Sequence, residues 1–429
     1  MLLQSFEIQG TVISLIEEMT ADWDLELEEE ISGEQQLIAD LNFSSVDFVQ
    51  LFVVIEEEFQ KKLGFHDLLM RDGTYVDDLS VAQIAAFVQS KLASETVSQS
   101  TNLNLASTAT TDQATINQNQ VNQFRNRIPA PPLPSSTTGG KNKRAIFVLC
   151  PSRSGSTLLR VMLAGNKQLF APPELHLLPF ENLLQRKLAF SNDLNQHLLN
   201  GTVRALMELK GCTSTQAQQM MTQWEEQSLT TKEFYTLMQG ELGERILVDK
   251  TPSYSYHADI LKRAETDFEQ PLYLHLLRHP YGMIRSFCDA KLDRLLPFMQ
   301  GDDFKREQYA ELAWLTCNQN ISDFLHTVPP ERQFKLKFED LVTQTQTVVT
   351  DMCNFIGVDF QVEMLEPYKE KKQRMTDGVE AVSKMSGDLK FHLHRTIEPE
   401  MAYRWKQYHT VDFLGEVTKE LAASFGYQI

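Results

Sequence analysis

The chain has 429 residues, of which 42% are hydrophobic and 23% charged, and its formal net charge is −18. This length suffices for one large domain and a small one. The five cysteines are scattered without a Cys-x-x-Cys pair, which disfavours a disulfide framework or a metal site and suits a reducing compartment. We find no leader-like start and no run of 18 or more apolar residues, so we expect a cytoplasmic protein without a membrane span.

The negative charge is concentrated at the start of the chain. Residues 1–94 contain 19 acidic and 4 basic residues, a net charge of −15, which leaves −3 for all the rest. This balance argues against nucleic acid as a partner and favours docking of the first part onto basic protein surfaces.

Residues 1–95 are expected to form a small all-α domain of four helices. Apolar residues at helical spacing over 8–16, 46–59 and 81–92 predict three main helices. A short element near Val76–Leu79 completes the predicted bundle.

The second of these helices starts in the sequence Asp40-Leu-Asn-Phe-Ser-Ser-Val-Asp-Phe-Val-Gln-Leu51. One interpretation is that Ser44 and Asp47 merely form a capping-box-like helix start. The segment also resembles the acyl carrier protein family, in which 4'-phosphopantetheine is attached to the serine of Asp-Ser-Leu. The resemblance implies that Ser45 is the attachment site, with Ser44 in place of the usual aspartate, and that a phosphopantetheinyl transferase is a partner.

Residues 96–143 are predicted to be a flexible linker. Ser, Thr, Asn and Gln dominate its first part, and Pro129-Ala-Pro-Pro-Leu-Pro134 and a Gly pair follow. Such a composition offers few apolar side chains to bury, so we expect a tether that is stiffer near its end.

Residues 144–429 are predicted to form an α/β domain with a P-loop-type parallel sheet flanked by helices. Strand-like apolar runs occur at 145–149, 245–248, 272–277 and 334–338, separated by long helical segments. This alternation is typical of a mostly parallel sheet with its sites at the carboxyl ends of the strands.

A predicted anion-binding turn follows the first of these strands, in Cys150-Pro-Ser-Arg-Ser-Gly-Ser-Thr-Leu-Leu-Arg160. The N–H groups of such a turn and of the helix after it favour a bound phosphate, although a lone Ser/Gly turn is also common in ordinary folds. The lysine of a nucleoside-triphosphatase loop is missing. The motif instead resembles the 5'-phosphosulfate loop of sulfotransferases that use 3'-phosphoadenosine 5'-phosphosulfate (PAPS). The matching residues are Arg153, Ser154, Gly155, Ser156 and Thr157.

A second motif is Leu272-Tyr-Leu-His-Leu-Leu-Arg-His-Pro-Tyr-Gly-Met-Ile-Arg-Ser286. A strand is predicted to end at Arg278 and a helix to open at Pro280. The resemblance implies that Arg278 and Ser286 bind the 3'-phosphate of PAPS, a contact for which arginine is well suited. The alternative is a structural ion pair of Arg278 at the strand end.

A third motif, Val248-Asp-Lys-Thr-Pro252, also stands at a predicted strand end. By resemblance, Lys250 faces the departing phosphate and neutralises the charge that develops there. A lysine that only faces solvent is the alternative.

The segment Ala171-Pro-Pro-Glu-Leu-His-Leu-Leu178 supplies the candidate base. A hydroxyl must lose its proton as it attacks sulfur. In the tyrosylprotein branch of sulfotransferases a Glu in this region takes that proton, and Glu174 matches it. His176 is an alternative base, a partner of Glu174, or a structural histidine.

Near the C-terminus, Val382-Ser-Lys-Met-Ser-Gly-Asp-Leu-Lys-Phe-His-Leu-His-Arg395 resembles the segment that closes over the cofactor. Lys384 is the implied PAPS contact, and His392 and His394 are further candidates for the site. Lys337-Phe-Glu-Asp-Leu341 also matches a recurring family segment, which we interpret as structural.

The whole arrangement resembles the carrier–sulfotransferase portion of cyanobacterial polyketide synthases that make terminal alkenes. The resemblance implies a β-hydroxyacyl substrate on the phosphopantetheine arm, sulfated with release of 3'-phosphoadenosine 5'-phosphate (PAP), and polyketide synthase or fatty-acyl-loading enzymes as partners. No Gly-x-Ser-x-Gly elbow occurs, so a later thioesterase step needs a separate protein. The rival interpretations are a P-loop kinase and an inactive carrier or nucleotide-binding scaffold.

Overall fold

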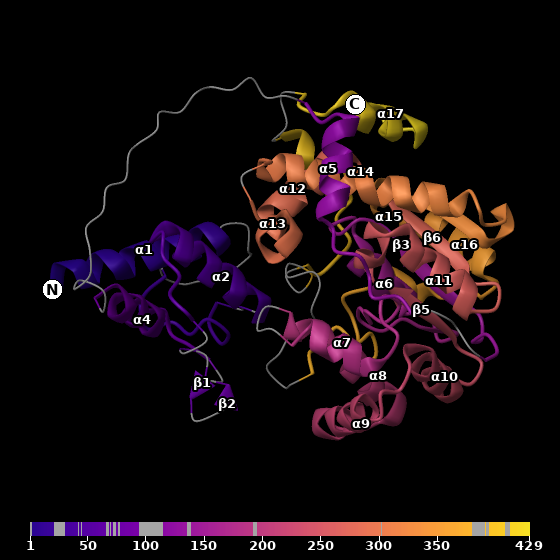
Figure 1. The fold of residues 1–429 in the computed structure, drawn as a ribbon, viewed down its shortest axis with the longest axis horizontal. Coiled ribbons are helices and arrows are strands. Elements are labelled where there is room, and N and C mark those ends of the chain that lie inside the picture. The colour runs from indigo at the N-terminus through magenta and orange to yellow at the C-terminus, as the bar shows by residue number, and fades with distance from the viewer. Residues whose placement is uncertain are drawn as a thin grey trace. The chain divides into compact units, whose positions relative to one another are not determined.

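The computed structural model describes residues 2–20, 31–41, 43, 45–65, 68, 70–71, 74–75, 78–93, 115–134, 139–191, 195–301, 303–379, 391, 394–407 and 412–429. They form two compact units, one within the first 93 residues and the other from residue 115 onward (Figure 1). Among the described helices, none has both the length and the apolar character needed to cross a membrane.

In the described part of the first unit, three long helices pack around one hydrophobic core. They are α1 (Leu2–Thr20), α2 (Ser45–Glu58) and α4 (Val81–Ala93), and they lie where the apolar periodicity predicted them. The unit also contains two antiparallel strands of two residues each, β1 (Met70–Arg71) and β2 (Thr74–Tyr75), which the predicted all-α domain did not include. Fully buried residues from each helix fill the core: Val12, Ile16, Leu51, Ile55, Ile84 and Val88.

The short helical element predicted near Val76–Leu79 is wrong for its described part, because Asp78 and Leu79 are not helical. The Asp78 carboxylate accepts hydrogen bonds from the backbone N–H groups of Ile38 and Ala39, both at 2.9 Å. The Leu79 carbonyl accepts from the Leu37 N–H at 2.9 Å. Asp78 and Leu79 therefore satisfy the polar backbone of the 37–39 turn and do not continue into a helix.

The second unit contains a five-stranded sheet in the order β4-β5-β3-β6-β7, and all of its strand pairs are parallel. The strands are β3 (Ala145–Leu149), β4 (Leu169–Phe170), β5 (Ile246–Lys250), β6 (Leu272–Leu277) and β7 (Gln333–Lys337). The predicted α/β class is confirmed. The prediction missed β4, and β5 runs two residues further than predicted, so that Lys250 is its last residue.

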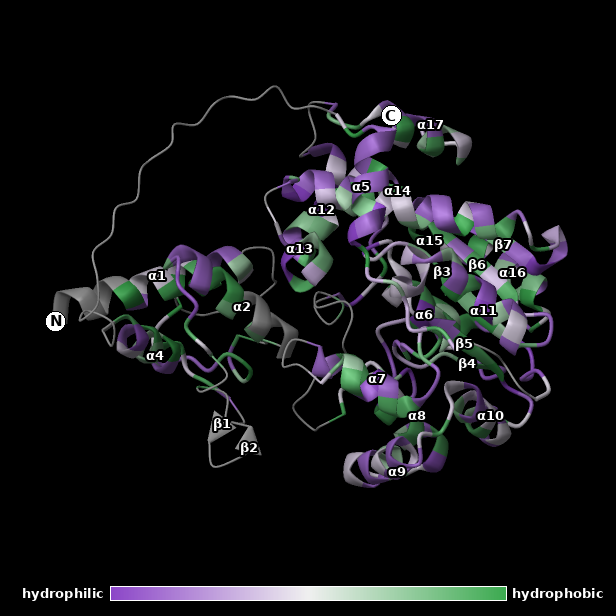
Figure 2. Ribbon diagram, in the orientation of Figure 1, coloured by the Kyte–Doolittle hydropathy of each residue, from purple (hydrophilic) through white to green (hydrophobic). Residues whose placement is uncertain are grey.

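Helices cover both faces of the sheet. The odd-numbered side chains of β3 pack with α8 (Asn200–Lys210), α9 (Ser214–Glu226), α10 (Thr231–Glu241) and α11 (Ala258–Asp267). The even-numbered ones pack with α6 (Ser156–Leu163), α15 (Phe338–Thr343) and α16 (Thr345–Ile356). In Figure 2 these helices mix hydrophobic and hydrophilic colours, as expected for helices with one buried face.

A third cluster lies beside the sheet around α14 (Arg306–Leu325), with α5 (Gln118–Arg127), α12 (Pro280–Asp289) and α17 (Glu416–Ser424). The connections contain short helices and single 3₁₀ turns: α7 (Leu183–Ala189), α13 (Leu292–Leu295), η1 (Gln196–Leu199), η2 (Pro252–Tyr256), η3 (Pro297–Met299), η4 (Pro330–Arg332), η5 (Val362–Leu365), η7 (Pro399–Ala402) and η8 (Arg404–Gln407).

The flexible linker predicted over 96–143 is wrong for 115–134 and 139–143, which belong to the second unit. Helix α5 begins with a capping box, in which the side chain of Asn117 accepts from two backbone N–H groups. Its buried face consists of Val121 and Phe124, both 0% exposed. The Arg125 guanidinium, further along the helix, donates to Asn320 of α14 at 2.7 Å. A few apolar residues at helical spacing therefore anchor an otherwise polar segment. The remaining linker residues lie outside the described part of the chain.

Phe124→Ala should destabilise the second unit by about 3–5 kcal/mol, the usual cost of removing a fully buried phenylalanine side chain. Gln123→Ala, an exposed position on the same helix, should change the free energy of unfolding little. Denaturant unfolding followed by tryptophan fluorescence measures both. An unchanged midpoint for Phe124→Ala would mean that α5 does not stabilise this unit.

Candidate active site

The predicted motifs gather at one edge of the sheet. Val148 of β3 pairs with Lys250 of β5, and Leu149 pairs with His275 of β6. Since the strands are parallel, the segments that follow them emerge at their common carboxyl edge, where ligands of open α/β sheets bind. The turn after β3, the end of β5 and Arg278 after β6 are thereby brought together.

The turn between β3 and α6 has the geometry of an anion-binding loop. Arg153 and Gly155 have φ angles of +66° and +86°, in the left-handed region, and this reversal lets α6 start at Ser156. The first N–H groups of a helix have no acceptor within the helix, so they can donate to a phosphate. Ser154 is fully buried, and its Oγ has no hydrogen-bond partner among the described residues.

Cys150, at the start of this turn, is not a nucleophile in this structure. The side chain is fully buried, and burial raises the pKa of its thiol to about 12. The thiol therefore stays protonated, whereas reactive cysteines are thiolates in electropositive, partly exposed places.

Gly155→Ala should disrupt the turn. A Cβ at this position would meet Phe338 Cδ2 at 2.3 Å, in addition to the positive φ. Gly357 has nearly the same φ, +84°, but a Cβ there would meet no described atom within 4 Å. Gly357→Ala therefore isolates the backbone penalty, about 1–2 kcal/mol. Gly155→Ala should lower the melting temperature further and weaken PAP binding in a calorimetric titration. Equal effects of the two changes would contradict the tight packing of the turn.

The two predicted phosphate-binding motifs contact each other. Arg153 Nε donates to Ser286 Oγ at 3.1 Å, and Arg278 Nη1 donates to the Arg153 carbonyl oxygen at 2.8 Å. The Arg278 guanidinium lies 4.5 Å from the centre of the Phe338 ring, and Trp314 Nε1 donates to the Arg278 carbonyl at 2.9 Å. Arg278 is thus held by two side chains outside the phosphate-binding motifs, Phe338 and Trp314, whereas Arg153 is held by Ser286 and Arg278 of the second motif.

Glu174, Lys250 and His176 form a second cluster. Lys250 Nζ donates to Glu174 Oε1 at 2.6 Å, and His176 Nε2 lies 3.3 Å from Glu174 Oε2. The Lys250 side chain is 2% exposed and that of Glu174 is 19% exposed. On the other side of the imidazole, Nδ1 lies 3.3 Å from Ser253 Oγ.

The environment keeps the Glu174 carboxyl ionised. Burial alone would raise its pKa, but the Lys250 ammonium and the His176 imidazole outweigh burial and lower the pKa to about 2. A carboxylate with so low a pKa is a weak base. It becomes a better proton acceptor only when the ammonium moves away from it.

Four further predicted site residues lie near the C-terminus or at the proposed carrier serine. Lys384 and His392 lie outside the described residues. His394 Nδ1 lies 2.8 Å from Glu398 Oε1. Helix α2 begins at Ser45, whose side chain is not among the described ones.

The sequence motifs did not point to Ser253, to Trp314 or to the contacts of Phe338. The Lys337–Leu341 segment, interpreted as structural, supplies the ring that packs on both Gly155 and Arg278. Phe338 could have been found from the resemblance of this segment to a recurring segment of the family. Ser253 follows the Lys250 motif directly, but nothing in the local pattern points to Trp314.

Comparisons with known proteins identify the family of the second unit. The sequence profile of the sulfotransferase family matches residues 145–362, and the chain belongs to this family.

Two solved structures are similar to the chain. The sulfotransferase domain from the Curacin biosynthetic pathway is 37% identical, with a TM-score of 0.63, over 68% of this chain and 100% of that one. The sulfotransferase domain from the Synechococcus PCC 7002 olefin synthase is 36% identical, with a TM-score of 0.61, over 69% of this chain and 99% of that one. No curated protein matches the chain significantly. The chain is therefore a sulfotransferase, as predicted.

Proposed function

We propose that this chain transfers the sulfuryl group of PAPS to a hydroxyl of an acyl chain, namely the β-hydroxyl. The acyl chain is carried on a phosphopantetheine arm attached to Ser45. The observation that supports it most is the Glu174–Lys250 pair, with its 2.6 Å contact, at the strand edge that also bears the 153–157 turn. A proton acceptor, a cation and an anion-binding turn are the groups that such a transfer needs.

Two neighbouring groups of residues would receive the two ends of PAPS. The turn at 153–157 would receive the 5'-phosphosulfate, and Arg278 with Ser286 the 3'-phosphate. Because Arg153 contacts Ser286 and is itself held by Arg278, the two sites are mechanically linked. Arginine also matches phosphate geometry in a bidentate way. Lys384 is a further proposed contact of the donor.

In the proposed transfer step, each bond that changes and the proton that moves can be assigned. The acceptor oxygen forms a bond to sulfur, and the bond from sulfur to the bridging oxygen breaks. Its electron pair leaves with the 5'-phosphate of PAP, and the hydroxyl proton passes to Glu174. Lys250 turns toward the leaving phosphate as negative charge develops there. Loss of its ammonium neighbour raises the pKa of Glu174, which makes the carboxylate a stronger base at this moment. His176 keeps the carboxylate oriented.

The tethered substrate is supported by the chain's own organisation and by its relatives. An acidic helical unit in which α2 starts at Ser45 precedes the sulfotransferase unit. The similar domains come from a Curacin pathway and an olefin synthase. By analogy, polyketide synthase or fatty-acyl-loading enzymes would supply the acyl group, a phosphopantetheinyl transferase would install the arm, and a separate thioesterase would act afterwards.

The test is PAP release by the full chain after its arm has been loaded with a β-hydroxyacyl group. We expect one PAP per loaded chain, and none from a chain loaded with the same acyl group without its hydroxyl. ATP in place of PAPS should give no phosphorylated product. PAP release that does not depend on the hydroxyl would be hydrolysis of the donor and would contradict the proposal.

A further inference from the structure

The segment Ala171–Glu181, between β4 and α7, bears both Glu174 and His176 but contains no helix or strand. It is almost wholly buried, so its backbone N–H and C=O groups need partners other than a regular ladder. In addition, His176 has a φ of +50°, in the left-handed region that a non-glycine residue adopts only when its surroundings hold it there. The segment must therefore be held in place by its surroundings.

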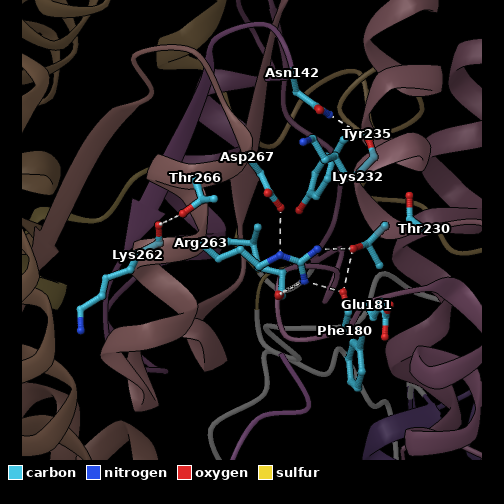
Figure 3. A network of polar contacts seen from close by, with 12 residues as sticks. Asn142, Phe180, Glu181, Thr230, Lys232, Tyr235, Lys262, Arg263, Thr266 and Asp267 are labelled. Atoms are coloured by element: carbon cyan, nitrogen blue, oxygen red, sulfur yellow. Dashed lines mark hydrogen bonds and ion pairs between the residues drawn. The ribbon is translucent and has the colours of Figure 1, made fainter. Parts of the chain in front are cut away.

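Buried arginines hold the two ends of this segment. Arg160 Nη1 donates to the Ala171 carbonyl at 3.2 Å. Arg263 Nη1 donates to the Leu178 carbonyl at 2.6 Å and also to that of Phe180. Figure 3 shows the guanidinium of Arg263 between Asp267 and the Phe180 carbonyl. These contacts anchor the ends but not the residues beside Glu174.

The middle of the segment is held on both sides of its backbone. Arg186 Nε donates to the Leu175 and His176 carbonyls at 3.0 and 3.2 Å, and two hydroxyls accept from the N–H groups. The Leu175 N–H donates to Thr251 Oγ1 at 3.2 Å, and the Leu177 N–H donates to the Tyr254 hydroxyl oxygen at 2.8 Å. The Leu178 N–H also points to the Tyr254 oxygen, at 3.3 Å. Because these oxygens accept from the backbone, each hydroxyl hydrogen is left to donate elsewhere.

Both hydrogens go to one carboxylate. Thr251 Oγ1 donates to Asp249 Oδ1 at 2.8 Å, and the Tyr254 hydroxyl donates to Asp249 Oδ2 at 3.2 Å. Tyr235 of α10 donates to the same Oδ2 at 2.5 Å. Asp249 is 1% exposed and lies immediately before Lys250 in β5. Since side chains alternate across a strand, β5 presents Lys250 to one side and this carboxylate to the other.

We propose that Asp249, acting through Thr251 and Tyr254, is a positioning residue that holds Glu174 in line with the acceptor hydroxyl. The inference rests on the proposed role of Glu174 as the base. Strand β5 thus supplies both Lys250, the ion-pair partner of Glu174, and Asp249. The Asp249 carboxylate orients the two hydroxyls that accept from the backbone N–H groups beside Glu174. A shift of about 1 Å at the base is enough to lower the rate about 100-fold.

The sharpest test compares Thr251→Val with Thr251→Ser. Valine has the shape of threonine without its hydroxyl, whereas serine retains the hydroxyl. Thr251→Val should lower kcat for PAPS-dependent sulfate transfer about tenfold, with PAP affinity unchanged within about twofold, and Thr251→Ser should restore kcat. Asp249→Asn and Tyr254→Phe should lower kcat by about 10- to 100-fold. Tyr235→Phe, which removes a donor to Asp249 that makes no hydrogen bond to the backbone of the segment among the described residues, is the control for a lost buried hydroxyl.

A double-mutant cycle separates this inference from the proposed function. In a Glu174→Gln background, Thr251→Val should cause little further loss of the residual rate, because it acts through Glu174. A full tenfold loss in that background, or a Tyr235→Phe effect on kcat equal to that of Tyr254→Phe, would overturn the positioning role. Full activity of Glu174→Gln itself would instead refute the base assignment on which the inference rests.

Discussion

Glu174→Gln is expected to lower kcat for sulfate transfer by about 100- to 10,000-fold, the range typical of losing a general base. The amide keeps the volume of the carboxylate and an oxygen that can still accept from Lys250, but it cannot take a proton from the acceptor hydroxyl. PAP affinity should stay within about twofold of the wild type, since no donor-binding residue is altered. Initial rates of PAP formation and calorimetric PAP titration measure the two effects.

The neighbouring imidazole provides the comparison for this result. His176 lies 3.3 Å from Glu174, so it is the alternative base. His176→Gln should reduce the rate less than Glu174→Gln, since in our account the imidazole only orients the carboxylate. A larger loss from His176→Gln would assign the proton transfer to the histidine. Loss of PAP binding in Glu174→Gln would show that Glu174 is structural.

Arg278→Ala is expected to weaken PAP binding about 100-fold, because charge-assisted hydrogen bonds to phosphate contribute about 1.5–3 kcal/mol each. The affinity for AMP, which lacks the 3'-phosphate, should fall much less. Arg285→Ala is the matched control: Arg285 lies on α12, 40% exposed and paired with Asp289, and its loss should leave both affinities unchanged.

The ratio of the PAP and AMP affinities decides this prediction. If Arg278→Ala weakens PAP and AMP equally, the arginine supports the 153–157 turn through its bond to the Arg153 carbonyl and does not read the 3'-phosphate. A protein that unfolds on substitution would lose affinity for both ligands together with its cooperative melting transition, which a thermal scan detects.

Most of the sheet could be predicted from the sequence because β3 is an apolar run of five buried residues and β6 is a run of six buried residues that is apolar except for His275. Strand β4 was missed because it has only two residues, too few to show any periodicity. Helix α5 was missed for a different reason. Its polar composition masks two apolar residues, Val121 and Phe124, which are buried only because α14 and its neighbours cover them.

The candidate site could be predicted motif by motif but not as an assembled arrangement. Glu174 and Lys250 are 76 residues apart in the chain, yet their side chains meet at 2.6 Å. That contact depends on β4 lying next to β5, which the sequence pattern did not reveal. The buried Asp249 carboxylate was equally hidden, because a charged residue inside a strand shows no partner until the fold places Thr251 and Tyr254 around it.

The central claim is transfer within one chain, from bound PAPS to a group carried on Ser45. Its most direct test is the intact mass of the full chain after treatment with a phosphopantetheinyl transferase and a β-hydroxyacyl coenzyme A, and then with PAPS. Our account predicts a mass increase of one acyl-phosphopantetheine that is absent in Ser45→Ala, followed by the mass of one sulfuryl group that is absent in Glu174→Gln. Acyl loading without any later gain of a sulfuryl group would contradict the account.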